Sequence, residues 1–211
     1  MGSMVSRLVR QLTLGAAIAA SAATVLAEDA QTLFQALLEE SGMVMKCDEG
    51  YVDAPLVANE VLPFEKALRT ADGAMEIRFA IRPLARITID YEDPHNAAPE
   101  PEHLFPLLFQ SLTESLSGGR HSPHREYPAK LAMELFNAEW AGASTFDVVD
   151  DFQTEYKHGF MVAMHGSGKA DAYTVMLFND YEAARPLIDQ SLTCLVFRPA
   201  AESAPEPPAG D

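Results

Sequence analysis

Two spacings of apolar residues alternate along this chain, one typical of helices and the other typical of strands. In residues 30–40 (AQTLFQALLEE) the apolar side chains share one stripe, which predicts an amphipathic helix that ends at Ser41-Gly42. Met43–Asp53 is expected to be a turn region or a short strand. Phe64–Thr70 (FEKALRT) and Ala74–Ile81 (AMEIRFAI) alternate apolar and polar residues around a turn, which predicts a β-hairpin.

The second half of the chain continues this alternation. Leu104–Leu116 predicts a helix, because Pro106 lies in its first turn and Gly118-Gly119 follows its end. A second hairpin is predicted around the turn Gly166-Ser167-Gly168-Lys169. The remaining elements are expected to be a helix over Pro128–Trp140, strands over Ser144–Val149, Gly159–His165 and Ala170–Asn179, a helix over Asp180–Gln190 and a strand over Thr193–Phe197.

The strand expected at Ala170–Asn179 determines the predicted architecture. It carries apolar residues on both faces, with Tyr173 and Val175 on one and Met176 on the other, so both faces must be covered. The hairpins require antiparallel pairing, and the covered faces require helices on both sides. We therefore predict an α/β fold of the α+β type, a three-layer α/β/α sandwich with a mostly antiparallel sheet, as a single domain over residues 28–198.

The first 27 residues have the pattern of a cleaved signal peptide. Arg7 and Arg10 precede an uncharged, Ala-rich apolar run from Leu12 to Val25, and Ala27 occupies the expected cleavage position. The alternative is a membrane anchor, but the run is shorter than the ~20 residues that cross a bilayer. We therefore expect a soluble protein of the bacterial periplasm or one that is secreted. Residues 199–211, rich in Pro, Ala and Glu, are expected to form a disordered tail.

The chain is strongly acidic, with 15 basic and 31 acidic residues and a formal net charge of −16. Removal of residues 1–27 takes away two arginines and no acid, which makes the charge more negative still. Nucleic acids and anionic membranes need a positive face, so neither is an expected partner.

Two cysteines, Cys47 and Cys194, are present. In an oxidising compartment the simplest reading of such a pair is a disulfide, which would join the start of the domain to its last strand. A loop of this length gives up to ~4–5 kcal/mol in the chain-entropy description. The alternative is two separate buried thiols.

Two segments resemble catalytic or metal-binding motifs, the turn around Ser167 and the acidic loop 90–103. Ser167 lies between two glycines but lacks the G-x-S-x-G pattern of hydrolases, and Lys169 is not followed by the Ser or Thr of a phosphate loop. A tight turn explains this segment. The acidic loop 90–103 offers carboxylates and His95 to a divalent cation, but a solvated loop is the simpler reading. No catalytic residue, cofactor or metal site is predicted.

Two groups of residues are candidates for binding. The long, proline-containing loop 90–103 presents polar and aromatic side chains, and such loops often carry binding functions. Arg78 and Arg82 share one side of a strand and Arg86 follows, which makes this the one basic concentration in an acidic chain. These arginines either pair with the acidic loop or line a site for an anion or carboxylate. The candidate binding residues are Arg78, Arg82, Arg86, Tyr91, His95 and His103.

The order of these elements resembles the Mog1/PsbP-like fold. The resemblance lies in the pair FEKALRT and AMEIRFAI, and in the long hairpin YKHGFMVAMHGSGKADAYTVMLF that leads into a last helix and strand. It covers roughly residues 43–198 and rests on topology, so no functional residue is carried over. Members of that group are mostly non-enzymatic accessory proteins that bind other proteins, among them a nuclear-transport factor binder, a photosystem subunit and bacterial periplasmic proteins.

Three functions follow as hypotheses. The first is an exported, non-enzymatic accessory or binding protein that acts through a protein partner in the bacterial cell envelope. The second is a protein that binds a small ligand or a divalent cation through the loop 90–103 and Arg78, Arg82 or Arg86. The third is a hydrolase, which would need a cleft that holds a serine or a carboxylate beside a histidine.

Overall fold

The structure is a computed structural model that describes residues 30–47, 49–87, 101–149 and 152–199, with residues 101–103 described only in their backbone. The proposed signal peptide, the C-terminal tail and loop residues 90–100 lie outside the described residues. The chain divides into two compact units, of which the first ends at Leu37 and the second begins at Leu38. Residues 30–40 form the helix that the apolar stripe predicted.

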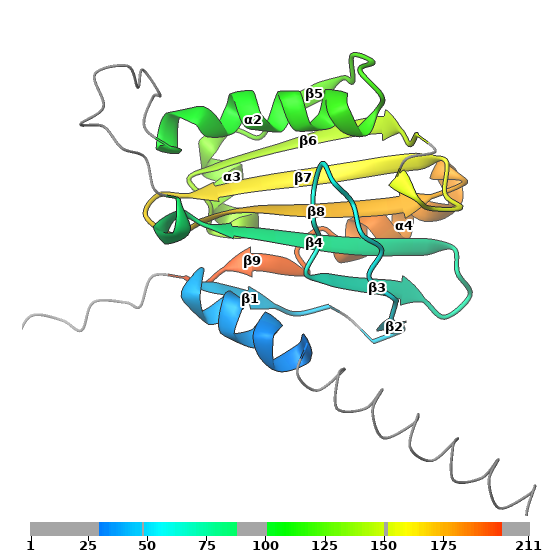
Figure 1. Cartoon of the computed structure of the whole chain (residues 1–211), viewed down its shortest axis with the longest axis horizontal. Coiled ribbons are helices and arrows are strands. Elements are labelled where there is room, and N and C mark those ends of the chain that lie inside the picture. The colour runs from blue at the N-terminus through cyan, green and yellow to red at the C-terminus, as the bar shows by residue number, and fades with distance from the viewer. Residues whose placement is uncertain (1–29, 48, 88–100, 150–151, 200–211) are drawn as a thin grey trace, which may run out of the picture. The chain divides into compact units, whose positions relative to one another are not determined.

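A seven-stranded sheet forms the centre of the second unit (Figure 1). Its strand order is β2-β3-β4-β8-β7-β6-β5, and every neighbouring pair is antiparallel. The strands are β2 (Tyr51–Asp53), β3 (Lys66–Thr70), β4 (Met75–Pro83), β5 (His124–Glu126), β6 (Trp140–Asp147), β7 (His158–Gly166) and β8 (Ala170–Phe178). The antiparallel pairing that the hairpins required is confirmed.

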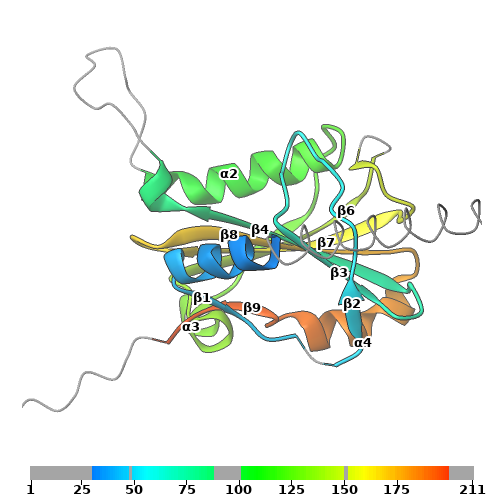
Figure 2. The same ribbon diagram turned by 60° about the horizontal axis from the view of Figure 1, so that its bottom comes forward.

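The three central strands are long and buried. Nine residues of β8 pair with nine of β4 on one side and nine of β7 on the other, and every residue of β8 is buried. One sheet face is covered by α2 (Pro101–Leu116). The opposite face is covered by α3 (Ala129–Phe136), α4 (Tyr181–Ser191) and a two-stranded sheet (Figure 2). The prediction of an α+β sandwich whose central strand is covered on both faces is therefore confirmed.

The two-stranded sheet joins β1 (Met43–Met45) to β9 (Leu195–Phe197) in antiparallel pairing. Beside it, Cys47 and Cys194 form a disulfide whose Cα atoms lie 4.5 Å apart. The backbone amide of Lys46 donates to the Cys194 carbonyl at 2.7 Å, so the backbone already brings the two cysteines together. The predicted pairing of the two cysteines is confirmed, and separate buried thiols are not present.

The core beneath α2 is aromatic. Phe105 and Phe109 are fully buried on the helix, and they contact Trp140 of β6 with ring centroids 5.0 and 5.6 Å apart. The sheet supplies small and medium side chains opposite them, so that the rings fit between strand and helix. The same cluster contains Ala80, Met161, Ala163, Tyr173, Val175 and Leu177.

One predicted helix boundary is wrong, and one strand was not predicted. The helix expected over Pro128–Trp140 ends at Phe136, because Asn137 adopts a left-handed conformation with φ of 51°. Trp140 instead begins β6, where it pairs with His165. The strand β5 was not expected, since its three residues are all exposed and show no apolar alternation.

The turn Gly166-Ser167-Gly168-Lys169 joins β7 to β8, as the sequence predicted. Gly168 has a φ of 65°, a conformation that residues other than glycine rarely adopt. The amide of Lys169 donates to the Gly166 carbonyl at 2.9 Å, which closes the turn. The segment is therefore a hairpin connection and not a phosphate-binding loop.

We expect reduction of the disulfide to destabilise the protein by up to about 4–5 kcal/mol, because the bond closes a loop between residues 147 positions apart in the unfolded chain. Urea unfolding with and without reductant measures this loss. The double variant Cys47→Ser/Cys194→Ser should match the reduced protein. Labelling of free thiols before reduction would contradict the bond.

Candidate functional site

A cluster of charged side chains lies at one end of the sheet face that α2 covers. The register of the β3–β4 hairpin places Arg69 opposite Glu76, and Arg78 is two residues farther along β4 on the same face. Oε1 of Glu76 accepts from Nε of Arg78 at 2.7 Å. Oε2 of Glu76 accepts from Nε and Nη2 of Arg69 at 3.1 and 2.6 Å. Glu76 and Arg78 are each only 2% exposed.

Aromatic rings enclose this charged cluster. The Arg78 guanidinium carbon lies 5.0 Å from the ring centroid of Phe152 and 5.7 Å from that of Phe64. Such positions allow a cation–π attraction that partly replaces the lost hydration of the guanidinium. Arg69 lies 6.0 Å from the Tyr156 ring, and its hydrogen bond with Glu76 raises the pKa of Arg69 above its usual value.

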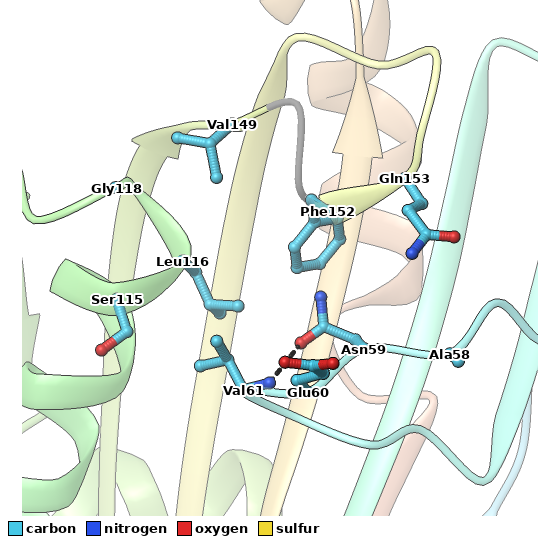
Figure 3. A pocket seen from close by; sticks show the side chains of 10 residues that line it. All are labelled: Ala58, Asn59, Glu60, Val61, Ser115, Leu116, Gly118, Val149, Phe152 and Gln153. Atoms are coloured by element: carbon cyan, nitrogen blue, oxygen red, sulfur yellow. Dashed lines mark hydrogen bonds between the residues drawn. The ribbon is translucent and has the colours of Figure 1, made fainter.

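A groove runs along this end of the molecule, between α2 and the segment 55–62. It consists of three adjoining clefts, and we call it the α2 groove. The first cleft, of about 520 Å³, is drawn in Figure 3. It shares Val61 and Ser115 with a second cleft of about 320 Å³ beside Arg82 and Tyr173. It shares Gln153 with a third, also of about 520 Å³, beside Arg69 and Arg78.

The wall of the groove at residues 58–62 is built around Asn59. Its Oδ1 accepts from the backbone amides of Val61 and Leu62 at 3.0 and 2.8 Å, which holds the segment in a tight turn. Asn59 is 9% exposed, and its Nδ2 donates to no described residue. Figure 3 shows this amide nitrogen pointing into the cleft, toward the Phe152 ring. Among the residues that the structure describes, none accepts a hydrogen bond from this donor, which faces the first cleft.

The opposite wall depends on two unusual backbone positions. Gly118 follows the end of α2 with a φ of 69°, and a Cβ there would lie 2.7 Å from Cγ1 of Val149. Gln153 has a φ of 52°, which is uncommon for a residue with a side chain. A residue with a side chain keeps this left-handed backbone only where its surroundings hold it, so the fold around Gln153 fixes this part of the wall.

The structure separates the three arginines that the sequence grouped together. Arg78 lines the third cleft of the groove and Arg82 lines the second. Nη1 of Arg82 donates to Glu65 at 2.7 Å. Arg86 lies outside the groove and forms a two-point ion pair with Glu40. Tyr91 and His95 are outside the described residues, and only the backbone of His103, in α2, is described.

Sequence reasoning missed Arg69, Asn59 and Gln153. A signal for Arg69 was present, because a hairpin centred on residues 71–73 places it opposite Glu76, and oppositely charged cross-strand pairs are common. No comparable signal marked Asn59 and Gln153. Their segments meet only when the sheet and α2 come together.

A fourth cleft, of about 680 Å³, lies between β5 and α3 and contains both a serine and a histidine. His124 and Ser144 pair across the β5–β6 ladder. However, Oγ of Ser144 donates to the Pro123 carbonyl at 2.9 Å. The hydroxyl is thus engaged by the backbone, and this cleft does not show the hydrogen-bonded nucleophile and base that the hydrolase hypothesis requires.

A buried histidine–aspartate pair lies beneath the start of α2. Nδ1 of His165 is 2.7 Å from Oδ1 of Asp171, and both residues are about 5% exposed or less. Phe105 lies over the imidazole with ring centroids 5.3 Å apart. Burial raises the pKa of Asp171, and the hydrogen bond from His165 opposes that rise.

Within residues 30–47, 49–87, 101–149 and 152–199, no group of three or more His, Cys, Asp or Glu side chains is arranged to hold a metal ion. Over the same residues, no helix combines the length and the apolar character needed to span a bilayer.

Comparisons with known proteins identify no family. No family model and no curated protein matches the chain. Among solved structures, the chain is similar to cyanobacterial PsbP (CyanoP) from Synechocystis sp. PCC 6803, with a TM-score of 0.40 and 11% sequence identity over 75% of this chain and 94% of that one. The order of elements also pointed to PsbP-like proteins. The fold of this chain is defined by the sheet topology described above.

We expect Asp171→Asn to change the pH dependence of stability. The raised pKa of Asp171 means that the folded state binds this proton more tightly than the unfolded state. Wild-type stability from this group is therefore present below a pH of about 3.8 and is lost as the pH rises through the higher folded pKa. The free energy of unfolding of Asp171→Asn should rise relative to wild type over that window, as measured by urea unfolding.

The exposed pair His158–Asp147 supplies a matched control, since its Nδ1–Oδ1 distance is 2.9 Å and both side chains are solvated. Asp147→Asn should show a much smaller change over the same pH range. Asp171→Ala leaves buried Nδ1 of His165 without its partner and should cost about 1–3 kcal/mol at neutral pH. A pH-independent difference between Asp171→Asn and wild type would contradict the expectation.

Proposed function

We propose that this protein is an exported, non-enzymatic binding protein of the bacterial cell envelope that holds an extended segment of a protein partner in the α2 groove. The observation that supports the proposal is the groove itself, which consists of three adjoining clefts. Val61 and Ser115 line both the first and the second cleft, and Gln153 lines both the first and the third. A row of clefts suits a chain better than a compact small molecule, because each cleft accepts a successive part of an extended ligand.

The lining of the groove supports this proposal. Val61 and Leu108 are large aliphatic residues that are 47% and 46% exposed at its rim, and exposed apolar side chains beside a cleft favour association. Its interior adds the amide donor of Asn59 and a charged end at Arg69, Glu76 and Arg78. Apolar contact with a few placed polar groups is the usual composition of a recognition site.

The proposed compartment rests on two independent features. The Cys47–Cys194 disulfide is stable in an oxidising environment such as the periplasm, and such bonds are rare in the cytosol. The N-terminal 27 residues have the charge and apolar pattern of an export signal. The acidic composition further favours a partner that is neutral or basic over most of its surface.

The substitution Ser115→Arg tests the proposed groove. Ser115 is exposed on α2 and lines both the first and the second cleft, so an arginine there fills the groove while α2 keeps a good helix former. In crosslinking from envelope extracts of the native host, we expect the variant to lose its discrete crosslinked partner, with affinity lowered about tenfold or more.

The matched control is Gln110→Arg, which adds the same side chain to an exposed position of α2 that contributes to none of the three clefts. It should retain the partner. Circular dichroism and the melting temperature check that both variants fold. Equal retention of a partner by the two variants, or the absence of any discrete crosslinked partner of the wild type, would count against the proposal.

A further inference from the structure

A second groove lies on the sheet face opposite α2. Thr145 of β6 pairs with Phe160 of β7, and Phe178 of β8 pairs with His158, two residues from Phe160. Cross-strand partners point to the same face of a sheet, so Thr145, Phe160 and Phe178 share one face. Trp140 lies five residues before Thr145 and contacts α2, which places that shared face on the other side, with α3 and α4.

This groove consists of two adjoining clefts, and we call it the aromatic groove. The first is the fourth cleft described above, of about 680 Å³, and its neighbour has a volume of about 560 Å³. Pro123, Thr145 and Tyr181 line both clefts. Leu131 contributes the wall from α3 and Tyr181 the wall from α4, so the groove lies between these two helices over the sheet.

Rings and apolar side chains form much of this lining. The Phe178 and Tyr181 rings have centroids 6.0 Å apart, and the Tyr127 ring lies 5.4 Å from that of Phe136, which fixes its position beside α3. Tyr181 is 49% exposed and Leu131 is 37% exposed, so solvent reaches the lining on both walls. An open row of rings and aliphatic groups is a surface on which the flat rings of prolines pack.

Ionisable groups of both signs lie in the groove. Those that line the two clefts are His124, Arg125, Glu126, Asp147 and His158. Nδ1 of His158 is 2.9 Å from Oδ1 of Asp147. Because cationic and anionic groups occur together, shape and apolar contact rather than net charge determine what fits here.

The chain itself contains a segment with the matching chemistry. Residues 199–211 read PAAESAPEPPAGD, in which Pro205 and Pro208 have the PxxP spacing. A polyproline II helix has three residues per turn, so these two prolines point to the same side. PxxP segments in this conformation bind aromatic-lined grooves, and their backbone is extended before binding, which lowers the entropy cost.

The point at which this segment leaves the domain is close to the groove. β9 runs from the side of α4 toward α3 (Figure 2), and Nδ2 of Asn137 at the end of α3 donates to the Phe197 carbonyl at 3.0 Å. Leu131 lies six residues before Asn137, about 9 Å along the helix axis. The seven residues from Arg198 to Pro205 span about 22 Å in a polyproline II conformation, so Pro205 can reach the groove.

We propose that residues 199–211 of the chain dock in the aromatic groove of the same molecule, with Pro205 and Pro208 against the rings of Phe160 and Tyr181. The covalent link supports this occupant, because a short flexible linker gives an effective concentration of about 1 mM and only a modest affinity is then needed. Docking also covers exposed apolar side chains on both walls. The site is separate from the α2 groove and does not rest on the proposed function.

Substitutions in the segment test its docking. In the full chain, Pro205→Ser/Pro208→Ser removes both prolines outside the packed core, and ¹H–¹⁵N NMR compares it with wild type. The amide signals of Leu131, Thr145 and Tyr181 should shift, whereas those of Asn59 and Ser115 in the α2 groove should not. Unchanged signals at the aromatic groove would overturn the proposal. Shifts that depend on protein concentration would assign the groove to the segment of a second copy and would also overturn it.

A peptide of residues 199–211, acetylated at its N-terminus, tests the same site in trans. Added to the Pro205→Ser/Pro208→Ser chain, it should cause saturable shifts at the aromatic groove. Wild type should bind it about fivefold or more weakly, because its own segment competes for the groove. The peptide with Pro205→Ser and Pro208→Ser is the control and should not bind. Equal affinity for the two chains, or no saturable binding, contradicts docking within one molecule.

Variants of the groove show where the peptide binds. In the Pro205→Ser/Pro208→Ser chain, Tyr181→Ala should lower peptide affinity about tenfold, as expected for loss of an aromatic anchor, and Leu131→Ala should lower it on the opposite wall. The matched control is Met133→Ala, which shortens a side chain of α3 that is 48% exposed and lines neither cleft. Circular dichroism checks that each variant folds. Equal peptide affinity in Tyr181→Ala, Leu131→Ala and Met133→Ala would refute the assignment.

Ser115→Arg separates this proposal from the proposed function. The substitution lies in the α2 groove, so it should leave peptide binding at the aromatic groove unchanged. Loss of the crosslinked partner in Ser115→Arg without any peptide binding to the Pro205→Ser/Pro208→Ser chain overturns only the docking of residues 199–211. Peptide binding with no partner at the α2 groove overturns only the proposed function.

Discussion

The nine-residue ladders that join β4, β8 and β7 are the constraint on which the rest of the structure depends. Each residue of β8 is buried, so both faces of the sheet must be covered. On one face α2 supplies this cover through Phe105 and Phe109. On the other, α3, α4 and the β1–β9 pair do so. Because the registers of these ladders are long, they also fix which side chains meet on each face.

The charged cluster is one of the places where this sheet departs from an apolar interior, and the buried His165–Asp171 pair is another. Burial of Arg78 and Glu76 costs desolvation free energy, which their mutual hydrogen bond and the rings of Phe64 and Phe152 offset in part. Apolar side chains of similar volume at these positions would avoid that desolvation cost. These charged side chains line the third cleft of the α2 groove together with Glu155.

The α2 groove follows from the same packing. The helix covers the aromatic part of the sheet and ends at Leu116, which lines the first cleft. The segment 55–62 lies beside it, and Asn59 holds the turn there with one side of its amide while the other side remains open. Thus the groove lies between α2 and a segment without regular structure. Such a place allows binding without disturbing the core.

Much of the fold was predictable from local patterns. Alternation at FEKALRT and AMEIRFAI indicated the first hairpin, Gly168 marked the second, and the apolar strand at Ala170–Asn179 required two covered faces. The prediction was wrong at two places with weak sequence signals. The helix α3 ends where Asn137 adopts a left-handed conformation, and the missed strand β5 consists of three exposed residues. The pairing of Cys47 with Cys194 was predictable because only two cysteines exist and their compartment was inferred.

The sequence by itself determined the periodicity of the elements, the antiparallel hairpins and the single possible disulfide, since all of these depend on neighbouring residues or on composition. Tertiary structure alone decided the site. Arg78, Arg82 and Arg86 are close in the chain, yet they face a buried glutamate, the second cleft and solvent in turn. Asn59, Arg69 and Gln153 are distant in the chain but line one groove, because burial of both sheet faces brings their segments together.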